Sequence, residues 1–347
     1  MPSTPMVTLD GSHGEGGGQI LRTGLTLALL TGRPFQMIKI RAHRDRPGLR
    51  PQHLTAVQAA ARLGEAEVEG AAVGSSTLVF RPRPYTPRDL EIDIGTAGAT
   101  ALVLQTLHLP LALRADQPVR LTLVGGTFNT KAPSFPFLEA TWRHYLALMG
   151  MPISLAMPSA GFYPRGGGRL EAWIEPATPR PLTLLDRGPL RGLRGVSMTA
   201  HLHRHDVAGR MLARAERRLA ERGLAAEIRQ AELSAPSPGA AISLTAEHAH
   251  CSATFVGLGA RGKPAEVVAD EAVDELLAYL DAAGAVDPHS ADQILLPLAL
   301  AEGRSAYTVA EVTEHLRTNA ATIRAFLDRD IRIEEPTDDQ PGRVLIA

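Results

Sequence analysis

The chain has 347 residues, and its 36 Lys and Arg balance 37 Asp and Glu to a formal net charge of −1. This balance excludes binding to nucleic acid through a bulk positive field, so any such contact must come from a local patch. The length predicts one large domain or two unequal domains. No apolar run approaches the roughly 20 residues of a membrane span, and the single cysteine, Cys251, excludes an internal disulfide. These features favour a cytoplasmic protein without membrane contacts.

A glycine-rich stretch joins a strand predicted over residues 6–9 to a helix predicted over 19–30. Four of the residues 14–18 are glycine, and the backbone N–H groups of such a turn can approach a phosphate at a helix N-terminus. Glu15 lies among them. A carboxylate there would repel an anion unless a divalent cation lay between the two, so Glu15 is a candidate Mg²⁺ or Mn²⁺ ligand. The alternative is a flexible turn. Neither a P-loop nor a dinucleotide-binding fingerprint is present.

The densest group of positive charges follows a strand predicted over residues 35–40. Residues 41–50 hold four arginines, and a helix is predicted over 52–63. Planar guanidinium groups on a loop between a strand and a helix suit bidentate contacts with phosphate. The alternative is a solvated loop.

The pattern of strands, glycine-containing turns and helices then recurs along the chain. Hairpin strands are predicted over 68–80, and further strands over 90–94 and 119–124. One helix is predicted over 101–111, and a second includes residues 145 and 149. The recurrence predicts repeated α/β units with helices on one face of each sheet. From about residue 186 to 276 the sequence pattern changes, and the strands and helices predicted there suffice for a small inserted α/β domain.

Two segments near the C-terminus carry polar residues at the ends of predicted helices. Asp292 and Gln293 head an apolar helix over 287–300, where they either cap the helix or recognise a ribose and a base. His315 precedes a helix that runs to residue 327 and that Thr318 or Asn319 would cap. A phosphoryl group on this imidazole would then lie near helix-end N–H donors. A structural histidine is the alternative.

The combination of these segments resembles the RNA 3′-terminal phosphate cyclases over nearly the whole chain. The matching segments are residues 14–22, 47–49 with 52–57, 102–106, 125–127, 161–168, 291–293, and His315-Leu with Thr318-Asn319. The resemblance implies an α/β (α+β) fold in which three repeated units, each a four-stranded sheet with two helices, form a large domain at 1–185 and 277–347. A smaller α/β domain is inserted at 186–276.

The resemblance also implies an activity. Family members use ATP and a divalent cation, Mg²⁺ or Mn²⁺, to convert an RNA 3′-phosphate into a 2′,3′-cyclic phosphate, which makes them ligase-type nucleotidyltransferases. A histidine carries AMP between the steps, and His315 matches it. A non-catalytic cyclase-like protein that binds RNA in ribosome assembly is the alternative, and a small-molecule transferase is a weaker one. Residues 310–314 depart from the proline- and cysteine-containing approach of some relatives.

The roles of further residues follow from the same resemblance. RNA with a 3′-phosphate end is the implied partner, and no sequence feature supports an oligomer. Glu15 would bind the metal, and His315 would be the nucleophile. The residues implied around the adenosine of ATP are Gln105, Pro133, Phe137, His289, Ser290, Ala291, Asp292 and Gln293. The residues implied on the RNA-phosphate side are Arg22, Arg41, Arg44 and Gln52.

Overall fold

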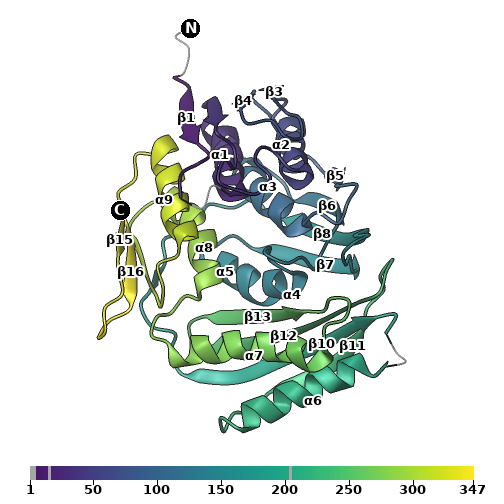
Figure 1. The fold of residues 1–347 in the computed structure, drawn as a ribbon. Coiled ribbons are helices and arrows are strands. Elements are labelled where there is room, and N and C mark those ends of the chain that lie inside the picture. Colours follow the sequence, from purple (N-terminus) through teal and green to yellow (C-terminus); the bar gives the residue numbers. More distant parts are fainter. Residues whose placement is uncertain (1–4, 15–16, 203–204) are drawn as a thin grey trace.

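A computed structural model describes residues 5–14, 17–202 and 205–347, and in these residues it shows four four-stranded sheets. The first three sheets belong to three repeated units that lie above a smaller insert in the view of Figure 1. Unit 1 consists of β1 (Val7–Asp10), α1 (Gly18–Thr31), β2 (Phe35–Ile38), α2 (Pro51–Leu63), β3 (Glu67–Glu69) and β4 (Leu78–Arg81).

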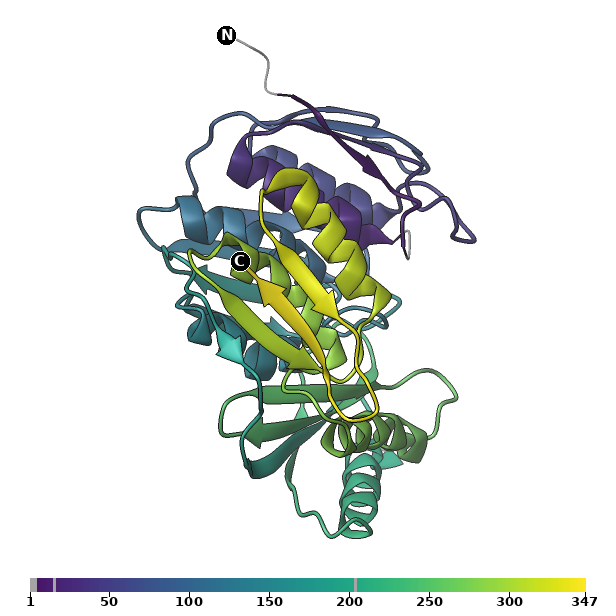
Figure 2. The ribbon, with the colours of Figure 1, turned by 90° about the vertical axis from the view of Figure 1, so that its left-hand side faces the viewer.

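Unit 2 repeats this order, except that its second helix is divided into three segments. Its elements are β5 (Leu90–Asp93), α3 (Thr100–Arg114), β6 (Val119–Gly125), α4 (Phe135–Phe137), the π-helical η1 (Leu138–Trp142), α5 (Arg143–Leu148), β7 (Ile153–Ser159) and β8 (Gly168–Ile174). Unit 3 consists of β9 (Thr183–Leu184), α8 (Pro288–Leu300), β14 (Ser305–Val309), α9 (Glu314–Phe326), β15 (Ile331–Glu334) and β16 (Gly342–Ile346). Figure 2 shows the sheet of unit 3 beside α9, with the insert below.

The three units share one topology. In each, the first strand pairs in parallel with the second, the second pairs antiparallel with the fourth, and the third forms the other edge, giving the orders β1-β2-β4-β3, β5-β6-β8-β7 and β9-β14-β16-β15. A parallel pair requires a crossover connection, which α1, α3 and α8 provide. The predicted repeat of four strands and two helices is therefore confirmed.

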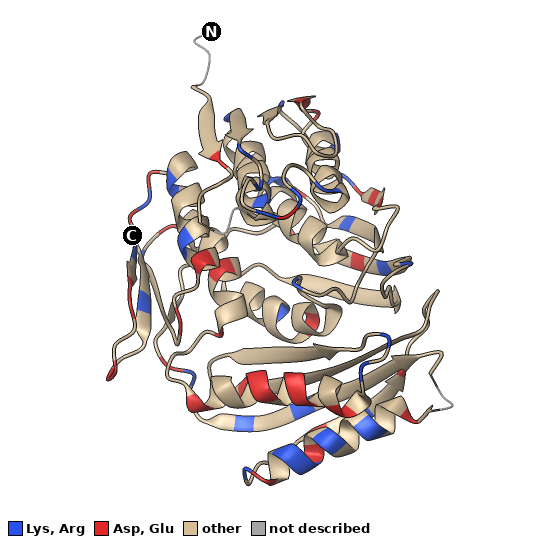
Figure 3. Cartoon of the chain, in the orientation of Figure 1, with Lys and Arg blue, Asp and Glu red and all other residues tan. Residues whose placement is uncertain are grey.

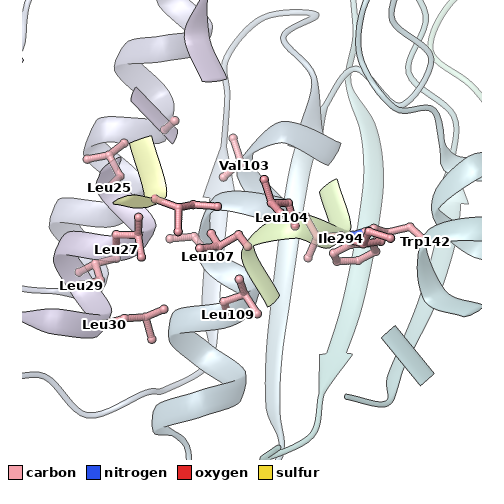
Figure 4. Close-up of a cluster of buried hydrophobic side chains, with 14 of the residues drawn as sticks. Leu25, Leu27, Leu29, Leu30, Val103, Leu104, Leu107, Leu109, Trp142 and Ile294 are labelled. Carbon is pink, nitrogen blue, oxygen red and sulfur yellow. The ribbon is translucent and has the colours of Figure 1, made fainter. Parts of the chain in front are cut away.

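The helices of different units pack on one another to form the main core. Leu25 and Leu27 of α1, Leu104 and Leu107 of α3 and Ile294 of α8 are each at most 1% exposed. Figure 4 shows these side chains in one cluster together with Trp142 of η1. Helix α1 is buried on most of its surface, as expected for a helix enclosed by neighbours, and it contacts α2, α3 and α9.

The insert is a fourth sheet with two helices, and it interrupts unit 3 between β9 and α8. Its elements are β10 (Leu190–Ala200), α6 (Val207–Ala220), β11 (Glu227–Glu232), β12 (Gly239–His248), β13 (Ser252–Leu258) and α7 (Ala265–Asp281). The predicted end of the insert, residue 276, falls inside α7, because Leu277 and Tyr279 still pack into the core of the insert. Among the described residues no helix is long and apolar enough to cross a bilayer.

The charges on the two insert helices neutralise one another. Arg210 and Arg214 of α6 pair with Glu266 and Asp270 of α7 at 2.8 and 2.7 Å, and Figure 3 shows the basic stripe of α6 facing the acidic residues of α7. Because the guanidinium groups of Arg210 and Arg214 already have carboxylate partners, these two residues are not a free phosphate-binding surface.

Candidate active site

The N-termini of helices from different units meet at one place. Gly14, ahead of α1, lies so close to Thr318 of α9 that an added Cβ would collide with its hydroxyl. Gly18, the first residue of α1, lies equally close to His53 in the first turn of α2. Glycine is needed at both positions because of these approaches, and Gly14 also has a φ of 55°. The ends of α1, α2 and α9 therefore bring the partial positive charge of three helix N-termini together, which suits an anion.

Helix α3 joins this group through the turn that precedes it. A Cβ added to Gly98 would lie 3.5 Å from the Cβ of Gln52, the second residue of α2. Gln52 is exposed at this junction, next to the meeting helix ends. Its predicted contact with RNA phosphate stays a prediction, and the structure gives its position.

His315 lies in the first turn of α9 and faces α1. The cap of α9 is Thr313, whose Oγ1 accepts from the backbone N–H of Leu316 at 3.2 Å. The predicted caps, Thr318 and Asn319, are wrong, because both lie inside the helix and are buried. The Nδ1 atom of the exposed His315 lies 2.7 Å from Oε1 of Gln19 on α1.

The hydrogen bonds of Gln19 fix which nitrogen of His315 carries the proton. The Nε2 amide of Gln19 donates to Oδ2 of Asp292 at 2.5 Å, so its Oε1 faces His315. An amide oxygen only accepts, and Nδ1 of His315 must therefore carry the proton in this contact. In the neutral ring the lone pair is then on Nε2. The chain from His315 through Gln19 to Asp292 holds the imidazole in this tautomer.

Asp292 at the end of this chain is a buried carboxyl group in α8. Burial raises its pKa, against the opposing effects of His315, Arg22 and the Gln19 hydrogen bond. Asn319 of α9 donates to the backbone oxygen of Asp292 at 2.7 Å and accepts from Thr23 of α1 at 2.8 Å. These bonds hold α1, α8 and α9 in register around His315.

A cluster of positive charge lies beside the meeting helix ends. Burial lowers the pKa of Arg22 to about 10, and Asp292 opposes this effect. Within the described residues no side-chain hydrogen bond or ion pair occupies the guanidinium of Arg22. Burial, followed by the charges of Arg22, Arg41 and Arg50, lowers the pKa of His53 to about 3. His53 is therefore neutral, and its Nδ1 accepts from the backbone N–H of Arg50 at 3.1 Å.

The arginine loop after β2 is folded back toward this cluster. Arg41 donates from Nη1 to the backbone oxygens of Arg46 and Gly48 at 2.8 and 3.2 Å, so part of its guanidinium closes its own loop. Burial and the nearby charges of Arg44 and Arg50 lower the pKa of Arg41. Like charges are placed together here at an electrostatic cost that an incoming phosphate would relieve.

A cavity of about 80 Å³ lies between α1, α3, α8 and α9. Gln105, Asp292 and Gln293 line it, together with Gln19 and Arg22. Gln105 donates to the side chain of Gln293, whose own Nε2 donates to the backbone oxygen of His289 at 2.5 Å. The structure thus brings together three of the residues predicted around the adenosine. Their amides bond to one another, and a ligand there would exchange these bonds for its own.

The remaining residues predicted around the adenosine have different surroundings. His289 is exposed, and its Nε2 lies 3.4 Å from Oε2 of Glu275. The hydrogen bond to this carboxylate raises the pKa of His289. Ser290 is 1% exposed and its hydroxyl has no partner among the described residues, whereas the backbone oxygen of Ala291 accepts from Tyr307 at 2.7 Å. Phe137 is buried in α4, Pro133 precedes it in the loop before that helix, and neither lines the cavity.

The predicted metal ligand, Glu15, lies outside the described residues. Among the residues that are described, no group of three or more His, Cys, Asp or Glu side chains is arranged to hold a metal. The prediction of a divalent cation therefore depends on Glu15 and on the phosphates that a nucleotide would bring.

Two residues of the site, Gln19 and His53, were not predicted from the sequence. A signal for Gln19 is present, because Gln19, Arg22, Thr23 and Thr26 recur every three or four residues and put one polar stripe on an otherwise apolar helix. All four line the cavity. His53 gives no comparable signal, since its neutral state depends first on burial and then on the charges of Arg22, Arg41 and Arg50.

Comparisons with known proteins identify the family of the chain. A family model described as RNA 3′-terminal phosphate cyclase matches residues 13–333. The chain is 46% identical to the RNA 3′-terminal phosphate cyclase of Ralstonia nicotianae, over 99% of this chain and 97% of that protein. It is 44% identical to the proteins of that name from Caldivirga maquilingensis, over 94% of both chains, and from Koribacter versatilis, over 99% of this chain and 95% of that one. The chain belongs to the RNA 3′-terminal phosphate cyclase family.

Proposed function

We propose that the protein converts an RNA 3′-terminal phosphate into a 2′,3′-cyclic phosphate, with ATP as co-substrate and His315 as the carrier of AMP. One observation carries this proposal: Nδ1 of His315 lies 2.7 Å from Oε1 of Gln19, an arrangement that puts the lone pair of the neutral ring on Nε2. A ribosome-assembly protein without catalysis would have no need for a histidine held in one tautomer.

In the first step, Nε2 of His315 attacks the α-phosphorus of ATP. A P–N bond forms, the bond to the β-phosphate oxygen breaks, and pyrophosphate leaves. The ring becomes cationic in the adduct, and its Nδ1–H then makes a charge-assisted hydrogen bond to Gln19. The carboxylate of Asp292, which accepts from the same Gln19 amide, polarises that bond and stabilises the cation.

In the second step, an oxygen of the RNA 3′-phosphate attacks the phosphorus of the adduct and breaks the P–N bond. The product is an anhydride between the RNA phosphate and AMP, and His315 is regenerated. The ribose 2′-hydroxyl then attacks the former 3′-phosphate and expels AMP, so that the cyclic diester closes. The hydroxyl and the phosphorus are held together by the sugar itself, which lowers the entropic cost of this step.

The RNA 3′-phosphate would be held by Arg22, Arg41, Arg44 and Gln52, and the meeting helix ends would offer N–H groups to phosphate. Asp292, Gln105 and Gln293 offer hydrogen-bonding groups to the ribose and the base. A divalent cation bound with Glu15 would neutralise the phosphate charge.

The test is covalent labelling. The protein is incubated with α-labelled ATP and Mg²⁺ or Mn²⁺, denatured, and assayed for label held by an acid-labile, base-stable bond; a 3′-phosphorylated RNA is assayed in parallel for cyclic ends. We expect both signals in the wild type and neither in His315→Asn. The control is His250→Asn, which changes an exposed histidine of the insert and should keep both. Label on His315→Asn would contradict the assignment. RNA binding without label in the wild type would indicate the non-catalytic alternative.

A further inference from the structure

A tyrosine with an almost fully exposed ring lies in the loop between β7 and β8. Tyr163 is 82% exposed, although the next residue toward the N-terminus, Phe162, is only 6% exposed. A large ring in water contributes nothing to the stability of the fold, and the mechanism above makes no use of it.

The backbone under Tyr163 is fixed by the insert. The ring of Phe162 stacks on that of Phe128 with centroids 4.8 Å apart and planes 10° apart, and its other neighbour is Gly239, where an added Cβ would collide with the ring. The backbone N–H of Ala160 donates to the oxygen of Ser234 at 2.7 Å. Ser234 lies in the loop between β11 and β12, and Gly239 is the first residue of β12. The insert therefore contacts the segment before Tyr163 at two residues, Ala160 and Phe162.

A second anchor lies further along the loop. Arg165 donates from Nη1 to the backbone oxygen of Pro236 at 3.1 Å, and a Cβ added to Gly167 would contact the ring of the same proline at 3.2 Å. The exposed tyrosine is therefore bracketed by two anchored neighbours. Little conformational freedom of the backbone would be lost if a ligand covered its ring.

The loop is continuous with the predicted phosphate site. The backbone N–H of Thr127 donates to Gly161 at 3.0 Å, and that of Gly126 donates to Gly98 at 2.8 Å. A Cβ added to Gly166 would lie 2.7 Å from Cα of Ala97. The loops before α3, after β6 and after β7 thus form one bonded surface.

The near end of this surface is the junction of α2 and α3. Gly98 lies against Gln52 there, and Gln52 neighbours His53 at the meeting helix ends. Tyr163 lies at the other end, separated from the helix ends by the turn before α3. A chain whose terminal phosphate sits at the helix ends could follow this surface to the tyrosine.

We propose that Tyr163 is a stacking platform for a base of the RNA upstream of its 3′-terminal phosphate. This inference rests on the proposed function for the identity of the substrate, and it adds a subsite for the RNA chain itself. An exposed ring on a rigid backbone is the element that single-stranded nucleic acid uses for contacts that do not depend on sequence, because every base has a π-face. The near-neutral net charge fits this arrangement, since affinity beyond the terminal phosphate then comes from stacking and not from a general positive field.

The experiment compares a long and a short RNA. Fluorescence anisotropy at fixed salt, without ATP, measures Kd for a 3′-phosphorylated RNA of about 12 nucleotides, a length within the span of single-stranded binding sites, and for a 3′-phosphorylated dinucleotide. The variants are Tyr163→Ala and Tyr163→Trp. The control is Trp173→Ala, which removes an exposed aromatic at the opposite end of β8.

We expect Tyr163→Ala to weaken binding of the long RNA by about five- to a hundredfold, and Tyr163→Trp to retain it. Binding of the dinucleotide should not change in either variant, and Trp173→Ala should bind both RNAs like the wild type. In turnover, Tyr163→Ala should raise KM for the long RNA while kcat and labelling by ATP stay the same.

Three results would overturn the inference: wild-type affinity of Tyr163→Ala for the long RNA, an equal loss for both RNAs, or failure of Tyr163→Trp to restore binding. The failure of the proposed function looks different. If the wild type binds the long RNA through Tyr163 but forms no cyclic ends, the subsite stands and the activity falls. If it forms cyclic ends and Tyr163→Ala binds normally, only the subsite falls.

Discussion

Replacing Gln19 by methionine tests the geometry on which the proposed mechanism depends. Methionine has a similar length and shape but cannot join Nδ1 of His315 to Oδ2 of Asp292, contacts of 2.7 and 2.5 Å in the wild type. A hydrogen bond to a charged group contributes about 1.5–3 kcal/mol. Because the His315 ring becomes cationic in the adduct, loss of this bond should slow adenylylation by about ten- to a hundredfold. The substitution also leaves the buried carboxyl of Asp292 without that donor, which raises its pKa further and lowers the free energy of unfolding.

The assay is single-turnover labelling with α-labelled ATP, at a temperature where thermal unfolding shows the variant to be folded. The matched control is Thr31→Val at the other end of the same helix. The hydroxyl of Thr31 donates to the backbone oxygen of Leu27 and accepts from the backbone N–H of Arg33, and none of these residues lines the cavity. Thr31→Val should label at the wild-type rate. If Gln19→Met also labels at that rate, the imidazole is oriented by something other than Gln19, and the inference about its tautomer is wrong.

Three further predictions concern the metal, the RNA side and the buried carboxyl. Glu15→Gln should slow labelling and raise the concentration of divalent cation needed for half-maximal labelling; an unchanged metal dependence would make Glu15 part of the turn only. Arg44→Ala should reduce AMP transfer to RNA by about ten- to a hundredfold and lower the preference for 3′-phosphate over 3′-hydroxyl ends in competition binding, while labelling by ATP changes little. Because the pKa of Asp292 is raised to about 6, the free energy of unfolding of the wild type falls as pH rises from about 4 to about 6. Asp292→Asn lacks this loss, so its melting temperature relative to the wild type should rise between about pH 4.5 and 7.5. A constant difference between the two melting temperatures would refute the pKa shift.

The repeated fold could be predicted from the sequence because its signals are local. Each glycine-containing turn joins a strand to a helix, and the alternation of these elements is visible without knowledge of long-range contacts. The end of the insert was less predictable. The apolar pattern of α7 continues past residue 276 without a break. Only the packing of α7 against the insert sheet shows that the helix belongs to the insert up to Asp281.

The candidate site was predictable in its residue types but not in its connections. Asp292 and His315 stand out as polar residues at helix ends, yet the bridge between them is Gln19, almost 300 positions away from His315 in the chain. The sequence predicts Thr318 or Asn319 as a cap because threonine and asparagine are common caps. The same side chains also suit bonds between buried helices, and Asn319 makes two of these. A sequence pattern does not distinguish the two uses when the partner comes from another unit.

The arrangement of the units explains why the cavity requires all three units of the large domain. Helix α1 comes from unit 1, α3 from unit 2, and α8 and α9 from unit 3, and each contributes to the cavity. No described residue of the insert lines this cavity. What the insert does hold is the loop of Phe162, through Gly239 and Ser234. The repeated units therefore form the cavity, and the insert positions the surface over which we propose that the RNA chain approaches this cavity.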